Sequence, residues 1–400
     1  MLILDFLHSS LCLRAFQSMF LAAAFTISAD TPHKVSDEQS KGLVLHYTLK
    51  DLGETDLKPD NLTRQQEGLS QGPAINDYGD VIGNRSSGGF CILQNGCEYA
   101  PRLQGARFNF YSINNRKDVL FSISRGASVD WFIWAASKGW QGRRISIDPV
   151  ELEGNIIFLA KINDLQKVIG AAKPDNRSMP LEWDPQRGLR RVGFEQRENL
   201  HGTVNDINSR DTIAGKLHRH QEDFPYAMLD GRQLNLFKLR RQFQAPSDGK
   251  IVFEDLVLND GDHIYGTYWI DRHFDDPKAD KVKDFRAFKW VPAEGALTLL
   301  DIDGMRISAI NNRNILVGSH KGQASFREGS FKPISIISAI DVEETKGWHL
   351  LEATDINDEG QIVGYGIKDG AMHLFLAEPR VDKTLTEKLP GEVVDAAIIH

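Results

Sequence analysis

Two insertions in the chain gather side chains that could bind a metal ion or a ligand. The first holds His218, Arg219 and His220, and the second holds Asp271, Arg272, His273, Asp275 and Asp276. Imidazole groups are common zinc ligands, and His201 lies a short way before the first insertion, but no Cys-x-x-Cys or His-Glu-x-x-His motif accompanies these residues. We therefore predict no zinc site and treat the eight residues as candidate contacts to a binding partner.

A second segment with metal-ligand chemistry lies near the end of the chain. Asp355, Asn357, Asp358 and Gly360 resemble the start of a calcium loop, with oxygen donors at alternate positions and a glycine at the turn. Similar segments elsewhere in the chain lack matching donors, and no bidentate Glu follows at the required distance. Turn formation explains the same residues, so we predict no cofactor, with calcium as the alternative.

Covalent catalysis has no support in the sequence. There is no Gly-x-Ser-x-Gly motif, and Cys91 and Cys97 fall within segments that resemble strands. No phosphate-binding glycine-rich loop precedes a helix. Asp and Glu are numerous enough to supply a glycosidase pair, but the sequence does not indicate which two carboxylates would meet.

Seven asparagines recur along the chain. An aliphatic residue precedes each one, and an apolar pair follows five and six positions later, which indicates a strand, a turn and a second strand. The Asn side chain can close such a turn by bonding to backbone amides ahead of it. The predicted turn residues are Asn76, Asn114, Asn163, Asn208, Asn259, Asn311 and Asn357.

The third residue after each Asn should tolerate a positive φ, because a hairpin of this length requires it. Gly, Asp or Asn occupies that position in five repeats. Lys117 and Gln166 occupy it in the second and third repeats, so the sequence supports these two hairpins less well.

Each repeat continues with a second pair of strand-like segments, in most cases joined by a glycine-containing turn. Four short strands in a repeat of about 47 residues are typical of a β-propeller blade. We predict an all-β fold, a seven-bladed propeller of four-stranded blades over residues 42–378. Six blades are the alternative, because the second repeat is short and has no glycine three or seven residues after its Asn.

The seventh repeat ends after its third strand, near Pro379. Residues 42–53 precede the first repeat and show the alternation of a strand. We predict that this N-terminal segment pairs with residues 373–377 and completes the last blade. This pairing would close the ring and remove an open sheet edge.

The repeat also resembles a known family. Residues 356–364 read Ile-Asn-Asp-x-Gly-x-Ile-Val-Gly, His373-Leu-Phe follows them, and Asp51-Leu-Gly stands in the N-terminal segment. This pattern is similar to the HAF repeats of bacterial extracellular proteins, over roughly residues 42–378. The resemblance implies secretion and a propeller-like fold, and it carries no agreed catalytic residues.

The amino terminus favours export. Arg14 precedes an uncharged, mainly apolar run over residues 19–29 that ends in a small residue, as in a secretory signal peptide. We predict a signal peptide at 1–29, a linker at 30–41 and a C-terminal tail at 379–400, with secretion or a periplasmic location; a cytoplasmic location is the alternative. Export would allow a Cys91–Cys97 disulfide, with two buried thiols as the alternative.

Composition limits the classes of partner. The net charge of −8 argues against nucleic acid, and no apolar run is long enough to span a membrane. In a four-stranded blade, the longer insertions of this chain would gather on one face of the disc, which is typical of a binding face. We predict a module that binds a protein partner or a surface glycan there; the alternative is a glycan hydrolase or lyase with carboxylates at the central channel.

Overall fold

The computed structural model describes residues 46–55, 72–86, 88–93, 96–99, 106–126, 128–135, 143–145, 156–173, 178–192, 201–219, 222–236, 242–243, 249–272, 283–302 and 304–380. The chain divides into two units, Met1–Val44 and Leu45–His400, and every described residue belongs to the second. The predicted signal peptide (1–29), the linker (30–41) and nearly all of the predicted tail (379–400) lie outside the described residues. No helix in the described part is long and apolar enough to cross a bilayer.

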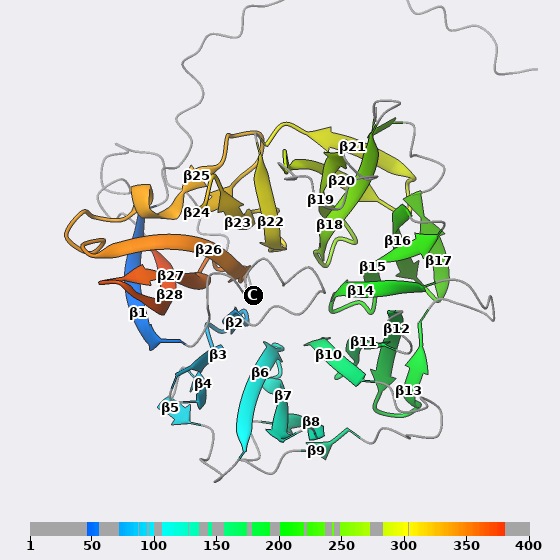
Figure 1. Cartoon of the computed structure of the whole chain (residues 1–400), viewed down its shortest axis with the longest axis horizontal. Coiled ribbons are helices and arrows are strands. Elements are labelled where there is room, and N and C mark those ends of the chain that lie inside the picture. Colours follow the sequence, from blue (N-terminus) through cyan, green and yellow to red (C-terminus); the bar gives the residue numbers. More distant parts are fainter. Residues whose placement is uncertain are drawn as a thin grey trace, which may run out of the picture. The chain divides into compact units, whose positions relative to one another are not determined.

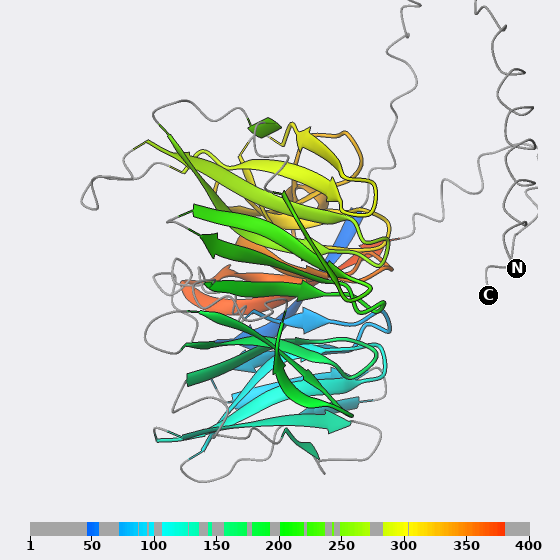
Figure 2. The same cartoon turned by 90° about the vertical axis from the view of Figure 1, so that its right-hand side faces the viewer.

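The described residues form seven antiparallel sheets of four strands, arranged as blades around a central channel (Figure 1). Figure 2 shows the blades edge-on. The seven-bladed propeller predicted from the repeats is confirmed. The second repeat forms a complete blade, so the six-bladed alternative is excluded.

Blades 1 to 6 each use four consecutive strands, and the first strand of each blade lies nearest the channel. Blade 1 comprises β2 (Ala74–Ile75), β3 (Val81–Arg85), β4 (Gly88–Leu93) and β5 (Gly96–Tyr99). Blade 2 comprises β6 (Arg107–Ile113), β7 (Asp118–Arg125), β8 (Ser128–Ala135) and β9 (Arg143–Arg144). Blade 3 comprises β10 (Ile156–Ile162), β11 (Val168–Lys173), β12 (Met179–Asp184) and β13 (Gly188–Arg191). Blade 4 comprises β14 (His201–Ile207), β15 (Ile213–Arg219), β16 (Glu222–Leu229) and β17 (Arg232–Asn235). Blade 5 comprises β18 (Lys250–Leu258), β19 (Ile264–Asp271), β20 (Arg286–Val291) and β21 (Ala296–Leu300). Blade 6 comprises β22 (Met305–Ile310), β23 (Leu316–His320), β24 (Gln323–Arg327) and β25 (Ile334–Ser335), and the short 3-10 helix η5 (Ile336–Ala339) follows it.

Blade 7 joins the two ends of the described chain. It contains β26 (Trp348–Ile356), β27 (Ile362–Lys368), β28 (Ala371–Arg380) and, as its outer strand, β1 (His46–Glu54). Leu49 of β1 lies opposite Ala377 of β28, and Glu54 lies opposite His373. The predicted closure of the ring by an N-terminal strand is therefore confirmed.

The core lies between neighbouring blades. One cluster joins Phe326 of blade 6 to Leu350 and Phe375 of blade 7, and similar clusters fill the other interfaces. A single blade cannot bury both faces of its sheet, so the apolar faces are removed from water only when the blades stack in a ring.

A glycine stands seven residues after the recurring Asn in six of the seven repeats, and it has a steric role. The inner strand of several blades carries a bulge, and a backbone carbonyl beside the bulge lies close to the glycine on the second strand. A Cβ at Gly170 would lie 2.0 Å from the carbonyl oxygen of Phe158, and one at Gly318 would lie 1.9 Å from that of Arg306. In blade 2 the corresponding position is Phe121, whose ring stacks on Phe132.

Candidate functional site

Each recurring asparagine holds a turn between the first and second strands of a blade. Oδ1 of Asn114 accepts hydrogen bonds from the backbone N–H groups of Arg116 (3.0 Å) and Asp118 (2.7 Å). The backbone N–H of Lys117 donates to the carbonyl of Asn114, which completes the turn. The turn role predicted for these residues agrees with this geometry.

The third residue after the Asn has a positive φ in all seven turns, including Lys117 (64°) and Gln166 (60°). The doubt that these two residues raised about their hairpins was wrong. The Asn side chain fixes the turn through several hydrogen bonds, and these outweigh the modest cost of a left-handed conformation in a residue with a side chain.

The same asparagines also join each blade to the next around the channel. Nδ2 donates to the carbonyl of the next repeat's Asn over 2.8–3.1 Å, from Asn76 to Asn114, Asn114 to Asn163, Asn163 to Asn208, Asn208 to Asn259, Asn311 to Asn357 and Asn357 to Asn76. Asn259 donates instead to Oδ1 of Asn314 at 3.0 Å. The result is a ring of buried amides that ties all seven blades together at one mouth of the channel.

The residues that follow the seven asparagines surround a cavity of about 170 Å³ at this mouth. They are Asp77, Asn115, Asp164, Ser209, Asp260, Asn312 and Asp358. Asn115 Nδ2 donates to Oδ2 of Asp77 (2.7 Å) and of Asp164 (3.3 Å), and Asn312 Nδ2 bridges Asp260 and Asp358 in the same way. Burial raises the pKa of the Asp77 carboxyl, although the hydrogen bonds from the Asp358 N–H and from Asn115 lower it. The negative charges of Asp358 and Asp164 act in the same direction as burial.

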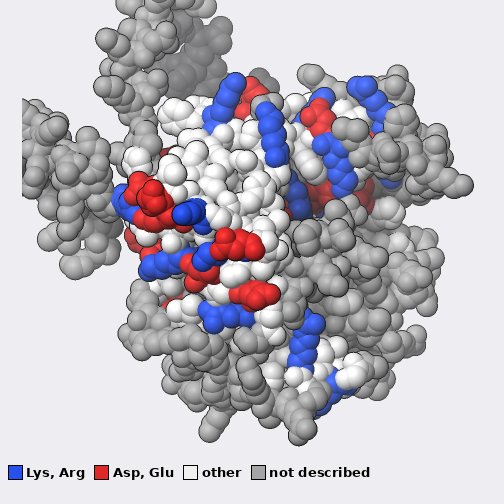
Figure 3. All heavy atoms as spheres, turned by 60° about the vertical axis from the view of Figure 1, so that its left-hand side comes forward, with Lys and Arg blue, Asp and Glu red and all other residues white. Residues whose placement is uncertain are grey.

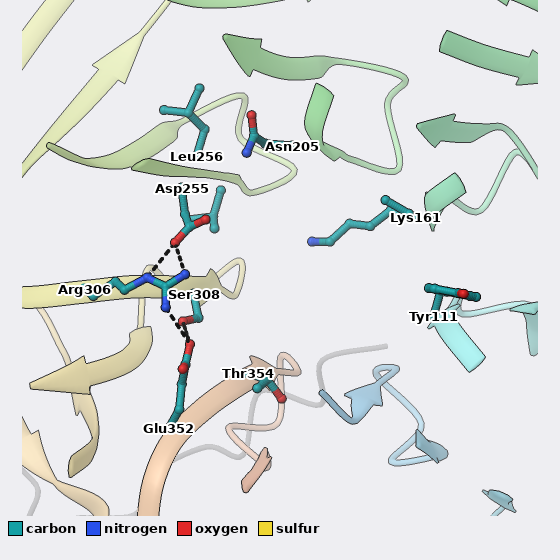
Figure 4. A pocket seen from close by; sticks show the side chains of 11 residues that line it. Tyr111, Lys161, Asn205, Asp255, Leu256, Arg306, Ser308, Glu352 and Thr354 are labelled. Atoms are coloured by element: carbon teal, nitrogen blue, oxygen red, sulfur yellow. Dashed lines mark hydrogen bonds and ion pairs between the residues drawn. The ribbon is translucent and has the colours of Figure 1, made fainter. Parts of the chain in front are cut away.

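A second cavity, of about 80 Å³, lies further inside the channel (Figure 4). On one side, Arg306 of β22 donates through Nε to Oδ2 of Asp255 (2.8 Å), and its Nη1 lies 3.6 Å from Oε1 of Glu352. Ser308 and Tyr365 donate hydrogen bonds to the same Glu352 carboxylate. Burial opposes the charge of Arg306, but Asp255 and Glu352 outweigh it and raise the pKa of the guanidinium.

Lys161 extends into the channel from blade 3 (Figure 4). Its Nζ lies 2.7 Å from Oδ1 of Asp206, and Oδ2 of Asp206 accepts the backbone N–H of Leu258 in blade 5. At the equivalent position of blade 7, Oδ2 of Asp355 accepts the backbone N–H of Ile75 in blade 1 (3.1 Å). Burial raises the pKa of Asp355 to about 6, although Lys161 and the backbone N–H groups lower it.

The carboxylates of this arrangement are held by cations or by backbone N–H groups. Asp206, Asp255 and Glu352 are each paired with a cation, and Asp355 accepts two backbone N–H groups. A glycosidase needs two carboxyl groups that flank a sugar, and both cavities are smaller than the roughly 300–1,000 Å³ of typical small-molecule sites. Within the described ranges, no group of three or more His, Cys, Asp or Glu side chains could hold a metal ion.

Four of the residues predicted to contact a partner stand at strand ends on the face opposite the asparagine turns. His218 and Arg219 end β15, while Asp271 ends β19 and is followed by the exposed Arg272. These strand ends belong to neighbouring blades 4 and 5. Nδ1 of His218 lies 2.6 Å from Oδ1 of Asp223 across the strand pair. The other four predicted contacts, His220, His273, Asp275 and Asp276, lie outside the described residues.

The segment that resembled a calcium loop serves the turn and the blade contacts. Asn357 accepts the backbone N–H of Gln361, and the backbone N–H of Asp358 donates to Oδ1 of Asp77. Gly360 has a φ of 82°, as the turn requires. These bonds agree with turn formation, the simpler explanation of this segment.

The two cysteines of blade 1 are out of register. Cys91 lies opposite Glu98, and Cys97 lies opposite Ile92, so one position separates the two cysteines along the strand pair. Because neighbouring residues of a strand point to opposite faces, this register gives no support to the disulfide, which stays a prediction.

Of the charged channel residues, only Asp355 was singled out from the sequence, and there as a possible calcium ligand. Lys161, Asp206 and Asp355 all stand two positions before a recurring Asn. A charge at that position could have indicated them, because the strand that leads into the Asn turn is the one nearest the channel.

Comparisons with known proteins assign this chain to no family. No protein-family model matches the chain, and no curated protein matches its sequence. Among solved structures, a streptogramin B lyase aligns with 84% of this chain and 98% of its own, at 8% identity and a TM-score of 0.47. The extracellular domain of the putative hybrid two-component system BT4673 from B. thetaiotaomicron aligns with 82% of this chain and 40% of its own, at 9% identity and a TM-score of 0.49. TolB from Acinetobacter baumannii aligns with 84% of this chain and 65% of its own, at 9% identity and a TM-score of 0.36.

Proposed function

We propose that this protein is an exported, non-enzymatic propeller that binds a protein partner. The partner would contact the face opposite the asparagine turns. A surface glycan is the other ligand class that this face could serve, and the experiment below includes it as a separate outcome.

The observation that carries this proposal is the contrast between the two faces. On the asparagine face, all seven turns have the same conformation and are bonded to their neighbours. On the other face, the connections differ greatly in length: residues 321–322 join β23 to β24, whereas residues 236–249 join blades 4 and 5 and residues 272–285 join β19 to β20. Loops that vary on a rigid scaffold are the usual carriers of recognition.

The channel gives less support to a hydrolase or a lyase. Three of its carboxylates, those of Asp206, Asp255 and Glu352, are paired with Lys161 or Arg306, and a carboxylate held by a cation is a poorer general acid or base than an unpaired one. The cavities are also small for a sugar ring with its neighbours. These observations favour binding over glycan chemistry.

The test compares two sets of variants at opposite faces. Immobilised protein is offered a panel of bacterial surface glycans and, separately, purified candidate extracytoplasmic proteins, and binding is measured by interferometry. We expect Arg272→Ala with His218→Ala to weaken binding to a protein at least tenfold. The matched control, Arg116→Ala with Arg210→Ala on the asparagine face, should bind as the parent does.

Other outcomes would contradict the proposal. Loss of binding only in the control pair would place the site on the asparagine face. Binding only to glycans would replace the protein partner. Glycan cleavage detected by mass spectrometry, and abolished by Glu352→Gln, would establish the enzyme alternative.

A further inference from the structure

The outer strand of blade 7 differs from the outer strand of every other described blade. In blades 1 to 6 a turn joins the third strand to the fourth, whereas β1 reaches β28 from the other end of the chain. Residues 56–71 lie between β1 and β2 in the sequence. The pairing of β1 with β28 is therefore held by non-covalent contacts alone.

Few apolar side chains anchor β1. Tyr47 and Leu52 are buried, while most of the other residues of the strand are exposed or half-buried. Tyr47 packs edge-on against Phe326 with ring centroids 5.6 Å apart, but its buried hydroxyl has no hydrogen-bond partner among the described residues. An unpaired buried hydroxyl destabilises the docked strand, so this anchor is weaker than a buried phenylalanine would be.

Several side-chain contacts of β1 are polar or charged and close to solvent. Nζ of Lys368 lies 2.7 Å from Oδ2 of Asp51, and Nδ1 of His373 lies 3.0 Å from Oδ1 of the same Asp51. Lys50 pairs with Glu378, where the two side chains are 55% and 28% exposed. Figure 3, which looks towards the side of the ring that carries blade 7, shows acidic and basic side chains interspersed on the described surface. Ion pairs of this kind are weakened by salt.

A further contact covers the free edge of β1. The backbone N–H of Leu49 donates to Oε2 of Glu344 (2.9 Å), and Arg380 pairs with Asp341 and Glu344 and donates to Oγ1 of Thr48. Asp341 and Glu344 belong to the connection between blades 6 and 7. This clasp protects the edge of the sheet, and it too consists of polar and charged groups.

From these contacts we propose that β1 is an exchangeable strand, and that two copies of this chain associate by each donating β1 to the β28 edge of the other. A second copy is the occupant that fits, because its β1 remakes every contact described above, including the burial of Tyr47 and Leu52. Exchange of an identical element loses no contact of the closed ring and is a low-cost route to a dimer. Higher salt loosens the ion pairs and should speed the exchange. This inference does not depend on the proposed partner-binding function.

The experiment uses Thr48 and Glu378, which lie directly opposite each other in the strand pair. Cα atoms of such pairs are about 4.5–5.5 Å apart, which suits a disulfide. Thr48→Cys and Glu378→Cys are made separately in full-length chains that also carry Cys12→Ser and Cys97→Ser. The two variants are mixed at high protein concentration and high salt, returned to low salt, and oxidised. We expect a covalent dimer in the mixture at a level several-fold above either variant alone.

Two controls keep the outcome decisive. The double variant, oxidised before mixing, locks β1 in its own ring and should abolish exchange with labelled parent chains. Tyr47→Phe removes the unpaired hydroxyl and should lower the yield of covalent dimer at a fixed time. If the double variant forms its internal disulfide but the mixture gives no excess covalent dimer, the proposal is overturned.

Discussion

A single asparagine in each repeat makes two kinds of contact that usually need separate residues. Asn311 accepts the backbone N–H groups of Arg313 and Ile315 within its own turn, and its Nδ2 donates to the carbonyl of Asn357 in the next blade. An aspartate could accept the first two bonds but could not donate the third when ionised. The amide is therefore the side chain that satisfies both the turn and the ring.

Replacing this amide should be costly. We expect Asn311→Ala to lower the free energy of unfolding by about 3 kcal/mol, because three hydrogen bonds of about 1 kcal/mol each are lost at a buried site. Denaturant titration at neutral pH measures the change. Arg313→Ala, at an exposed position in the same turn, should change the free energy of unfolding by less than about 0.5 kcal/mol. Equal effects of the two substitutions would show that the amide ring does not hold the blades together.

The carboxyl of Asp355 gives stability a pH dependence of defined sign. Its pKa is about 6 in the folded protein and has an ordinary value of 3.8, so the folded state binds the proton more tightly than the unfolded state. The stabilisation from this proton is fully present below about pH 4 and is lost as the pH rises through about 6. We expect Asp355→Asn to remove this part of the pH dependence.

The measurement compares denaturation midpoints between pH 4 and pH 7. The difference between the parent and Asp355→Asn should change across this window and level off above about pH 7. Glu359→Gln, at an exposed neighbouring position, should instead follow the parent curve. A constant difference between the parent and Asp355→Asn over the whole window would contradict the assignment.

At the scale of elements, the closing strand explains why the described ring has no large open edge. β1 pairs with β28 over residues 46–54 and places Tyr47 in the cluster between blades 6 and 7. Without β1, the backbone groups of β28 and the apolar side of the last blade would face water.

Truncation tests this role. A chain that begins at residue 56 should lose cooperative unfolding and expose apolar surface, measured by calorimetry and by binding of a hydrophobic dye. A chain that begins at residue 42 keeps β1 and should unfold in a single transition, as the parent does. A chain that begins at residue 56 and is as stable and cooperative as the parent would show that β1 is dispensable.

The element pattern was predictable because its causes are local. The Asn turn and the apolar pair come from hydrogen bonding and sterics within a few residues and repeat seven times, and the glycine recurs in six of the seven repeats. The conformation of Lys117 and Gln166 was misjudged because φ preference was weighed without the hydrogen bonds of Asn114 and Asn163. The bonds between blades, such as Asn357 to Asn76, join residues far apart in sequence, and local pattern gives no distance between such residues.

The channel shows the same limit at the scale of the whole molecule. Lys161 and Asp206 come from different blades, and only the closed ring places Nζ of one 2.7 Å from Oδ1 of the other. The sequence predicted the ring and the face that carries long connections, but it gave no sign that the channel charges neutralise one another. Their mutual pairing is one ground for the binding function proposed above.

The ring should tolerate new chain ends on one face and not on the other. His46 lies opposite Arg380, so a short Asn-Gly turn can join residue 380 to residue 46 and make blade 7 continuous, as the other blades are. With the chain opened between residues 276 and 277, between β19 and β20, no described strand pair is broken, and we expect a melting temperature within about 4 °C of the parent. Opening the chain between Lys117 and Asp118 instead cuts an asparagine turn and should lower the melting temperature by more than about 8 °C, because the hydrogen bonds within that turn lose their covalent connection.

In the first permutant, β1 is joined covalently to β28 at one end and to the following residues of the chain at the other, so this permutant should form no strand-exchanged dimer. Calorimetry and light scattering on the two permutants measure both effects, and equal melting temperatures would mean that the asparagine turns do not hold the ring together.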